Sequence, residues 1–353
     1  MKSRIVAGSI VLLLMTLGFT CLSTSLGETR PGSEAVEEMS LEESMDLAVA
    51  NILDHYLKPP AGREIVIVHD QEKILLAQHF AAGLVERGCR SRDFLVADNL
   101  DSSVGAFREV LNDEGAGLIV LASPRMLGGL KLYEKMAFVD NSPSLQCSCS
   151  PVFFDTVIPT ENLVRLYAVD PTETKDFLAD LHSELPEETS IHVSAPGGTD
   201  LKFVSRDWKT WPWEIATYPV EASVNGTIVV DGAVFFAEIA NPIRLQIREG
   251  KLVKIECHQK DDKVCERYVR EMNKVIESDP LNGQLAEVGV GGNGEARLCN
   301  VLMESESVRG TCHFCFGDSA EFGGKNQTSW HGGTVIVNQP TFYFGEKSVK
   351  PGD

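Results

Sequence analysis

The stretch Glu64-Ile65-Val66-Ile67-Val68, followed by a helical pattern over residues 71–87 and by Gly88, decides the fold class of the N-terminal half. A run rich in β-branched residues predicts a strand, and apolar residues at helical spacing predict a helix that Gly88 ends. Two further apolar runs, residues 94–97 and 117–122, predict strands that are covered on both faces. Strands that alternate with helices are typical of a parallel sheet with right-handed crossovers, so we expect an α/β domain here.

Helix signals flank this α/β pattern on both sides. Ser40-Leu41-Glu42-Glu43 reads as a capping box, and the helix it begins is expected to end before Pro59-Pro60. A second capped helix is expected from Pro171 to about residue 185. The polar break at residues 186–190 follows it and is interpreted as a domain boundary.

Beyond residue 190 the pattern changes to short alternating runs separated by Gly and Asn. Residues 227–230, 243–247 and 335–337 predict strands of a mostly antiparallel sheet, with one helix over residues 265–276. We therefore expect an α+β, mostly antiparallel C-terminal domain. The predicted organisation is a signal or anchor and linker over residues 1–32, the α/β domain over 33–186 and the C-terminal domain over 187–353.

Charge and the N-terminal segment limit the partners and the compartment. The 353 residues carry a formal net charge of −19, from 51 acidic and 32 basic side chains. This excess argues against binding nucleic acid, because such binding draws its affinity from Lys and Arg. The basic start followed by the uncharged residues 5–22 predicts an export signal or a membrane anchor, and a cytoplasmic protein if the start is misassigned.

The nine cysteines do not settle the compartment. Two close pairs occur, Cys147 with Cys149 and Cys312 with Cys315, and together they could form a thiolate zinc site. The first pair has the wrong spacing for a zinc knuckle, so we interpret both pairs as buried, inert thiols.

Carboxylates and imidazoles crowd into the C-terminal half at residues that suit a metal site. Neutral His nitrogens and ionised carboxylates suit Zn, Co or Mn, so a site for a divalent metal is predicted. The candidate metal ligands are Glu214, Glu287, Glu306, His313 and His331, with Glu287 as the catalytic residue.

Six phrases around these residues stand in an order that resembles the thermophilic-type M29 metallo-aminopeptidases, over about residues 190–353. They are Gly198-Thr199-Asp200-Leu201, Pro212-Trp213-Glu214, Asn225-Gly226-Thr227-Ile228, Ala286-Glu287-Val288-Gly289-Val290-Gly291-Gly292-Asn293, Glu306 through Gly310-Thr311-Cys312-His313 to Gly317, and Gly323-Gly324-Lys325-Asn326-Gln327 with His331. The resemblance implies two divalent ions on the five ligands above, in a cavity between an α/β and a β-rich domain. It also implies a peptide substrate, hydrolysis by a metal-activated water, and a homodimer.

The chain departs from that family's pattern at two positions. Gly333 stands where the family has a ligating aspartate, two residues after the last histidine, and Ala320 stands where it has a tyrosine thought to assist the transition state. Asp318 or Glu321 could replace the carboxylate, although a solvated loop is the preferred interpretation of both, and Tyr343 could return a phenol.

Two other functions stay open from the sequence. The chain is also similar to ring-cleaving dihydroxypyridine dioxygenases of the same fold, which use one ferrous ion on two histidines and an aspartate. A binding protein that kept the fold and lost catalysis is the third possibility. The glycines at residues 289, 291 and 292 have a purely structural interpretation as well, as a tight turn or a site of close packing against the other domain.

Overall fold

The computed structural model describes residues 39–96, 115–121, 136–139, 142–145, 152–154, 158–320 and 323–352. The predicted signal or anchor and the pair Cys147 and Cys149 lie outside these residues. Within the described part of the chain, no helix combines the length and the apolar character needed to cross a membrane.

The N-terminal half contains a four-stranded parallel sheet in the order β2-β1-β3-β6. Its strands are β1 (Glu64–His69), β2 (Arg90–Leu95), β3 (Ala116–Val120) and β6 (Val152–Phe154), and a separate hairpin joins β4 (Met136–Val139) to β5 (Ser142–Leu145). The predicted α/β class is confirmed. The expectation that residues 94–97 form a strand buried on both faces is wrong, because β2 begins at Arg90 and is an edge strand with Leu95 exposed.

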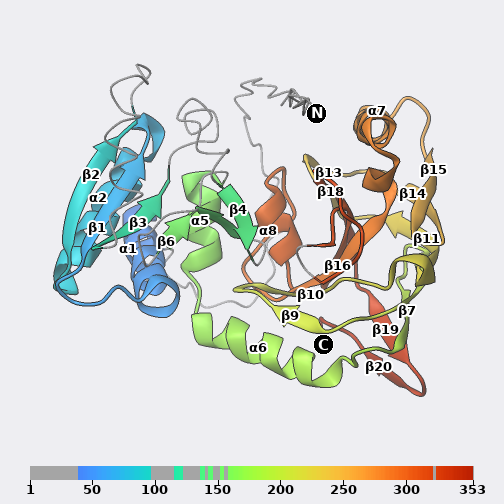
Figure 1. Cartoon of the computed structure of the whole chain (residues 1–353), viewed down its shortest axis with the longest axis horizontal. Coiled ribbons are helices and arrows are strands. Elements are labelled where there is room, and N and C mark those ends of the chain that lie inside the picture. Colours follow the sequence, from blue (N-terminus) through green and yellow to red (C-terminus); the bar gives the residue numbers. More distant parts are fainter. Residues whose placement is uncertain are drawn as a thin grey trace, which may run out of the picture. The chain divides into compact units, whose positions relative to one another are not determined.

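Helices of this half begin and end where the sequence signals lie. Ser40 forms both hydrogen bonds of the capping box, and the first helix ends at Lys58, in a left-handed conformation, before Pro59. The helical segments are α1 (Leu41–Asn51), the π-helix η1 (Ile52–Leu57), the 3-10 turn η2 (Gln71–Lys73), α2 (Ile74–Glu86), α5 (Thr160–Tyr167) and α6 (Pro171–Glu184). Figure 1 shows α2 lying against the parallel sheet.

Two seven-stranded antiparallel sheets form the C-terminal half (Figure 1). The predicted mostly antiparallel class is confirmed, and the division into two sheets is additional to the prediction. The first, called here the site sheet, has the order β13-β12-β18-β17-β16-β10-β9. Its strands are β9 (Trp208–Thr210), β10 (Glu214–Thr217), β12 (Ala233–Val234), β13 (Ala237–Glu238), β16 (Leu285–Gly291), β17 (Thr311–Gly317) and β18 (His331–Asn338).

The second sheet has the order β15-β14-β11-β8-β7-β19-β20. Its strands are β7 (Ser190–Ser194), β8 (Asp200–Val204), β11 (Asn225–Val230), β14 (Ile243–Arg248), β15 (Lys251–Cys257), β19 (Thr341–Phe344) and β20 (Lys347–Val349). The remaining helical segments are η4 (Glu221–Ser223), α7 (Lys263–Ser278), η5 (Pro280–Gly283) and α8 (Leu302–Ser307).

One hydrophobic core joins the two sheets. Alternate residues of the site sheet, such as Val288 and Phe314, belong to the same core as Phe203 and Leu245 of the second sheet. Because successive side chains of a strand point to opposite faces, the residues between them lie on the other face of the site sheet. The core therefore fixes the face on which polar side chains of β10, β16 and β17 must lie.

A second core belongs to the helices of the N-terminal half and reaches the start of β10. The indole of Trp213 meets the ring of Tyr167 edge-on, with 4.3 Å between ring centroids, and lies near Tyr56. This aromatic group holds the residue that precedes Glu214.

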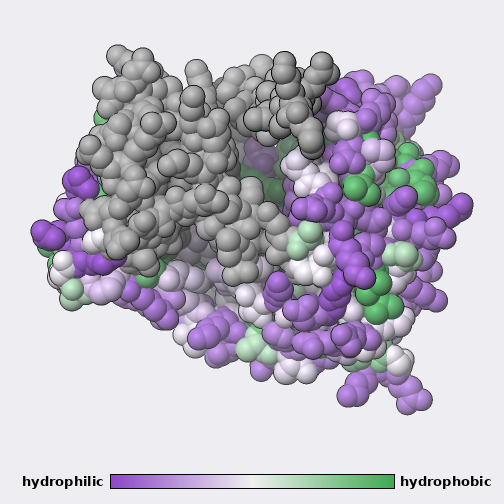
Figure 2. Space-filling model, viewed as in Figure 1, coloured by the Kyte–Doolittle hydropathy of each residue, from purple (hydrophilic) through white to green (hydrophobic). Residues whose placement is uncertain are grey.

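A disulfide that the sequence did not predict joins Cys257, at the end of β15, to Cys265 in α7. Cys312 is buried in the sheet core, as expected of an inert thiol. Figure 2 shows that the visible described surface over the antiparallel sheets is largely hydrophilic, with hydrophobic residues scattered across it.

Candidate metal centre

Four neighbouring strands of the site sheet bring four of the five predicted ligands together. Glu214 lies on β10, Glu287 on β16, His313 on β17 and His331 on β18. The order β18-β17-β16-β10 makes these strands adjacent although they are far apart in the sequence. Since the flanking residues of β10, β16 and β17 face the core, the ligands on those strands share the opposite face.

Glu287 lies at the middle of the cluster. Its Oε2 is 2.9 Å from His331 Nε2, and its Oε1 is 3.7 Å from His313 Nε2. His313 Nε2 is also 3.5 Å from Glu214 Oε2. The side chains of Glu287 and His313 are 4% and 1% exposed, so their mutual contacts decide their charge states.

Glu306 reaches the same cluster from α8, which lies outside the sheet. Its Oε1 accepts a hydrogen bond from the thiol of Cys315, at 3.7 Å. Ligand atoms of Glu306, His313 and Cys315 all lie within 4.8 Å of one another. All five predicted ligands are therefore brought together, with one cysteine that the sequence had assigned to inert packing.

The glycines of β16 make room for these groups. A Cβ at Gly289 would lie 2.0 Å from His313 Nε2, so the imidazole lies directly over this glycine. A Cβ at Gly291 would lie 2.3 Å from the carbonyl oxygen of Val308, next to the segment that carries Glu306. Gly289 and Gly291 lie within β16 and pack against the site itself, so the tight turn offered from the sequence is wrong for them. A Cβ at Gly292 would lie 2.5 Å from Leu178 Cδ2, which is the close packing against the N-terminal half that the sequence also offered.

Backbone contacts orient the two imidazoles differently. His331 Nδ1 donates to the carbonyl oxygen of Asp318 at 2.7 Å, and this bond turns Nε2 toward Glu287. His313 Nδ1 is buried and has no hydrogen-bond partner among the described residues. A buried nitrogen without a partner is rare and marks a place where another group is needed.

Burial and mutual charge separate the pKa values of the carboxyl groups. Burial raises the pKa of Glu214 to about 8, although the imidazole of His313 opposes this shift. Burial also raises the pKa of Glu306. For Glu287, burial alone would raise the pKa, but the two imidazoles outweigh it and hold the pKa at about 2. Glu287 is thus the carboxylate that stays ionised.

The pKa values of both imidazoles are raised. Burial would lower the pKa of His313, but Glu214 and Glu287 outweigh it and raise the pKa to about 9. The pKa of His331 is also raised, because its contact with Glu287 outweighs burial. Protons therefore balance the negative charge of this cluster when no cation does so.

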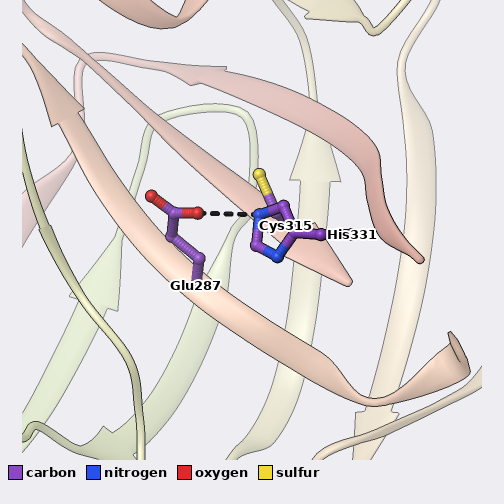
Figure 3. A group of neighbouring side chains, drawn as sticks. All are labelled: Glu287, Cys315 and His331. Atoms are coloured by element: carbon purple, nitrogen blue, oxygen red, sulfur yellow. Dashed lines mark hydrogen bonds and ion pairs between the residues drawn. The ribbon is translucent and has the colours of Figure 1, made fainter. Parts of the chain in front are cut away.

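The donor set fits a divalent cation. Oxygen and imidazole donors converge from five chain segments, and three overlapping groups of three have ligand atoms within 4.8 Å of one another. The groups are Glu214 with Glu287 and His313, Glu306 with His313 and Cys315, and Glu287 with Cys315 and His331 (Figure 3). Carboxylates and imidazoles without a buried Arg or Lys partner are typical of metal sites.

The residues suggested as replacements for missing groups lie elsewhere or serve other contacts. The Asp318 side chain is buried and accepts a hydrogen bond from the Thr328 amide, so its interpretation as solvated is wrong. Glu321 lies outside the described residues. Tyr343 is exposed and its ring stacks on His192 in the second sheet.

Cys315 is the residue of this cluster that sequence reasoning missed. Its Sγ also lies 3.1 Å from the hydroxyl of Thr334, and burial raises its pKa well above the usual value. The signal that could have found it is its position two residues after His313 in a strand, which places both side chains on one face.

A sheet face that gathers carboxylates and imidazoles defines this protein as one with a candidate divalent-metal centre. The model of the NicX family, described as 2,5-dihydroxypyridine 5,6-dioxygenase, matches residues 155–339. This match spans more than half of the 353 residues, so the chain belongs to the NicX family.

The fold is similar to that of a solved structure, wild-type AmpT from Thermus thermophilus. The TM-score is 0.57 at 13% identity, over 88% of this chain and 98% of the other. This likeness confirms the fold that the resemblance implied. No protein in a search of curated proteins matches the chain.

Proposed function

We propose that this protein is a metal-dependent aminopeptidase, which hydrolyses N-terminal residues from peptides. Its divalent cations would be held by Glu214, Glu287, Glu306, His313 and His331. The observation that carries the proposal is the convergence of three carboxylates and two imidazoles at one partly buried face of the site sheet. AmpT, an M29 aminopeptidase, has a similar fold, which supports the proposal at the level of the fold.

The number of carboxylates favours two cations over one. Three ionised carboxylates around a single divalent cation would leave a buried negative charge, and an unpaired buried charge is costly. Two cations would leave one positive charge, which a hydroxide formed from the activated water would balance, and the imidazoles would leave positions open for water and substrate. A pair of cations held by these residues would lower the pKa of a bound water and polarise a scissile carbonyl.

Glu287 has the central role among the residues of the chain. Its two carboxylate oxygens face different imidazoles, Oε1 toward His313 and Oε2 toward His331. The carboxylate therefore lies between the two histidines. Glu214 lies at the other side of His313, with its Oε2 3.5 Å from His313 Nε2, so two carboxylates face the same imidazole.

Hydrolysis of aminoacyl anilides by the full chain tests this proposal. Metal-loaded protein should release arylamine, chelation should abolish the release, and Glu287→Gln should lower kcat/KM by about 100-fold or more. Glu266→Gln, on the exposed face of α7, is the matched control and should retain activity. Intact anilides with Zn, Co and Mn alike would exclude the aminopeptidase.

A ring-cleaving dioxygenase is the second candidate, favoured by the family match. His313, His331 and Glu287 supply two imidazoles and one carboxylate, the donor set of a facial ferrous site. This function predicts one iron per chain and oxygen uptake with a dihydroxypyridine. About two Zn, Co or Mn per chain would favour the peptidase, and no bound metal would favour a binding protein.

The compartment and assembly are further parts of the proposal. We propose export or anchoring through residues 5–22, which the Cys257–Cys265 disulfide supports because disulfides persist in oxidising compartments. A homodimer follows from the family resemblance alone. The acidic charge supports a partner other than nucleic acid.

A further inference from the structure

The thiol of Cys315 faces the carboxylates and imidazoles of the candidate metal centre. It belongs to two of the three groups whose ligand atoms lie within 4.8 Å of one another, once with Glu287 and His331 and once with Glu306 and His313. Figure 3 shows the Glu287 carboxylate directed at the His331 imidazole, with Cys315 beside them. The sulfur atom therefore lies between the two halves of the cluster.

The neighbouring strand offers no donor at the position where the family resemblance implied an aspartate. Position 333, where an aspartate was expected from the family resemblance, is a glycine with φ +65°. A Cβ at this position would lie 2.5 Å from Met272 Sδ and 3.0 Å from the indole of Trp330. No side chain fits there without a rearrangement, so the missing carboxylate cannot come from this residue.

We infer that Cys315 is a metal ligand, and that its thiolate takes the place of the carboxylate absent at Gly333. This inference rests on the proposed metal site and adds the chemical class of cation that the site prefers. When a cation binds, Cys315 would ligate it as the thiolate, so the S–H bond would break and its proton would pass to solvent. Thr334, with its hydroxyl 3.1 Å from Sγ, holds the side chain toward the cluster.

Distance and charge agree with this role. Donors that share one tetrahedral cation at bond lengths of about 2.0–2.3 Å lie about 3.5 Å apart. The ligand atoms of each group here lie within 4.8 Å of one another, so small side-chain movements would bring them to that separation. Glu214, Glu287, Glu306 and a Cys315 thiolate carry one negative charge each, and together they balance two divalent cations. A thiolate also favours Zn, Co or ferrous iron over Mn and Mg.

The experiment uses the full chain loaded with Co²⁺. Cobalt in a protein site gives visible d–d absorption, and a thiolate ligand adds a near-ultraviolet sulfur-to-cobalt charge-transfer band. We expect both bands in the wild type. Cys315→Ser should lose the charge-transfer band, keep the d–d bands and bind Co²⁺ about 10- to 100-fold more weakly. Cys312→Ala removes a buried thiol from the core face of the same strand and should change neither band.

Each result of the cobalt experiment supports or contradicts Cys315 as a metal ligand. Wild-type d–d bands without charge transfer, or a charge-transfer band that survives in Cys315→Ser, would overturn the thiolate ligand and leave the metal site intact. Absence of all cobalt bands would overturn the site as well. X-ray absorption of the zinc-loaded wild type needs no variant, and it should show a sulfur scatterer at about 2.3 Å. A shell of nitrogen and oxygen alone would contradict the assignment.

Discussion

Gly289 has no side chain, and this absence lets the imidazole of His313 lie against β16. The two residues are paired across the strands in the sheet register, and a Cβ would fall 2.0 Å from the ring nitrogen. A single methyl group at this position is enough to move a candidate ligand.

Gly289→Ala should therefore displace His313. We expect a loss of about 1–3 kcal/mol in the free energy of unfolding, from overpacking, and at least about 10-fold weaker Zn binding. Denaturant titration and a competition assay with a chromophoric chelator measure the two effects. Gly294→Ala is the matched control, because its added Cβ would make only ordinary contacts at 3.6 Å or more. Equal zinc affinity in both variants would contradict this explanation.

We predict that an aspartate at position 333, as the M29 resemblance implied, destabilises the protein. Gly333→Asp places a side chain at φ +65° and against Met272, so the free energy of unfolding should fall by about 1–3 kcal/mol. In a Met272→Ala background the added cost should be smaller, because the thioether that occupies the space is gone. A double-mutant cycle measured by urea unfolding gives the coupling. Additive losses would show that Met272 is not the obstacle.

At the scale of elements, α8 carries Glu306 and is joined to α5 by an ion pair between buried Glu304 and partly exposed Arg165. Arg165 Nε lies 2.5 Å from Glu304 Oε1, and the Glu304 side chain is fully buried. The amide of Asn162 donates a further hydrogen bond to the same carboxylate. These contacts hold α8, and with it Glu306, beside the site sheet.

Arg165→Ala should leave the Glu304 charge buried without its cation. The expected loss is about 3–5 kcal/mol in the free energy of unfolding, and part of it should return in the double variant Arg165→Ala/Glu304→Gln. Chemical unfolding of the three proteins measures both steps. If the double variant were less stable than Arg165→Ala, the ion pair would not be the source of the loss.

A second link between elements depends on pH. Glu221 in η4 accepts hydrogen bonds from Arg206 and from the Lys325 amide near the Gly323-Gly324 turn. Burial raises the pKa of Glu221, but these hydrogen bonds outweigh it and hold the pKa below its ordinary value of 4.5. The folded state then binds the proton less tightly than the unfolded state, so the stabilisation is present above about pH 4.5 and is lost as pH falls through the lower folded value.

Glu221→Gln should therefore destabilise the protein by about 1 kcal/mol at pH 7, after allowance for solvent screening of this partly exposed pair. The difference from wild type should shrink as pH falls below 4.5. Thermal unfolding at a series of pH values checks the prediction. A difference that stays constant down to pH 3 would count against the role of the carboxylate charge.

At the scale of the whole molecule, the cluster couples metal binding to stability. Cations that bind only the folded chain stabilise it by about 4 kcal/mol at a free concentration about a thousand times Kd. Chelation should therefore lower Tm, and addition of Zn should restore it. His331→Ala removes one imidazole and should make Tm much less sensitive to the chelator. An equal response in both proteins would mean that the stabilising metal binds elsewhere.

The sequence was sufficient for the elements whose signals are local. The capping box at Ser40, the stop before Pro59 and the apolar runs of β1 and β3 appear where the pattern indicated, because capping and burial act over a few residues. Helix α5 was missed, since a helix of eight residues depends on tertiary packing for its stability.

The sequence by itself determined the fold class and the five candidate ligands. Hydrophobic periodicity predicted the strands and helices, and the residue types with the phrases around them predicted the ligands. Only the tertiary structure decided that Cys315 joins them, that Gly333 leaves no room for a side chain, and that Gly289 accommodates an imidazole. Those facts depend on which strands are neighbours and on their register, and contacts between residues distant in sequence are set by the packing of the whole sheet.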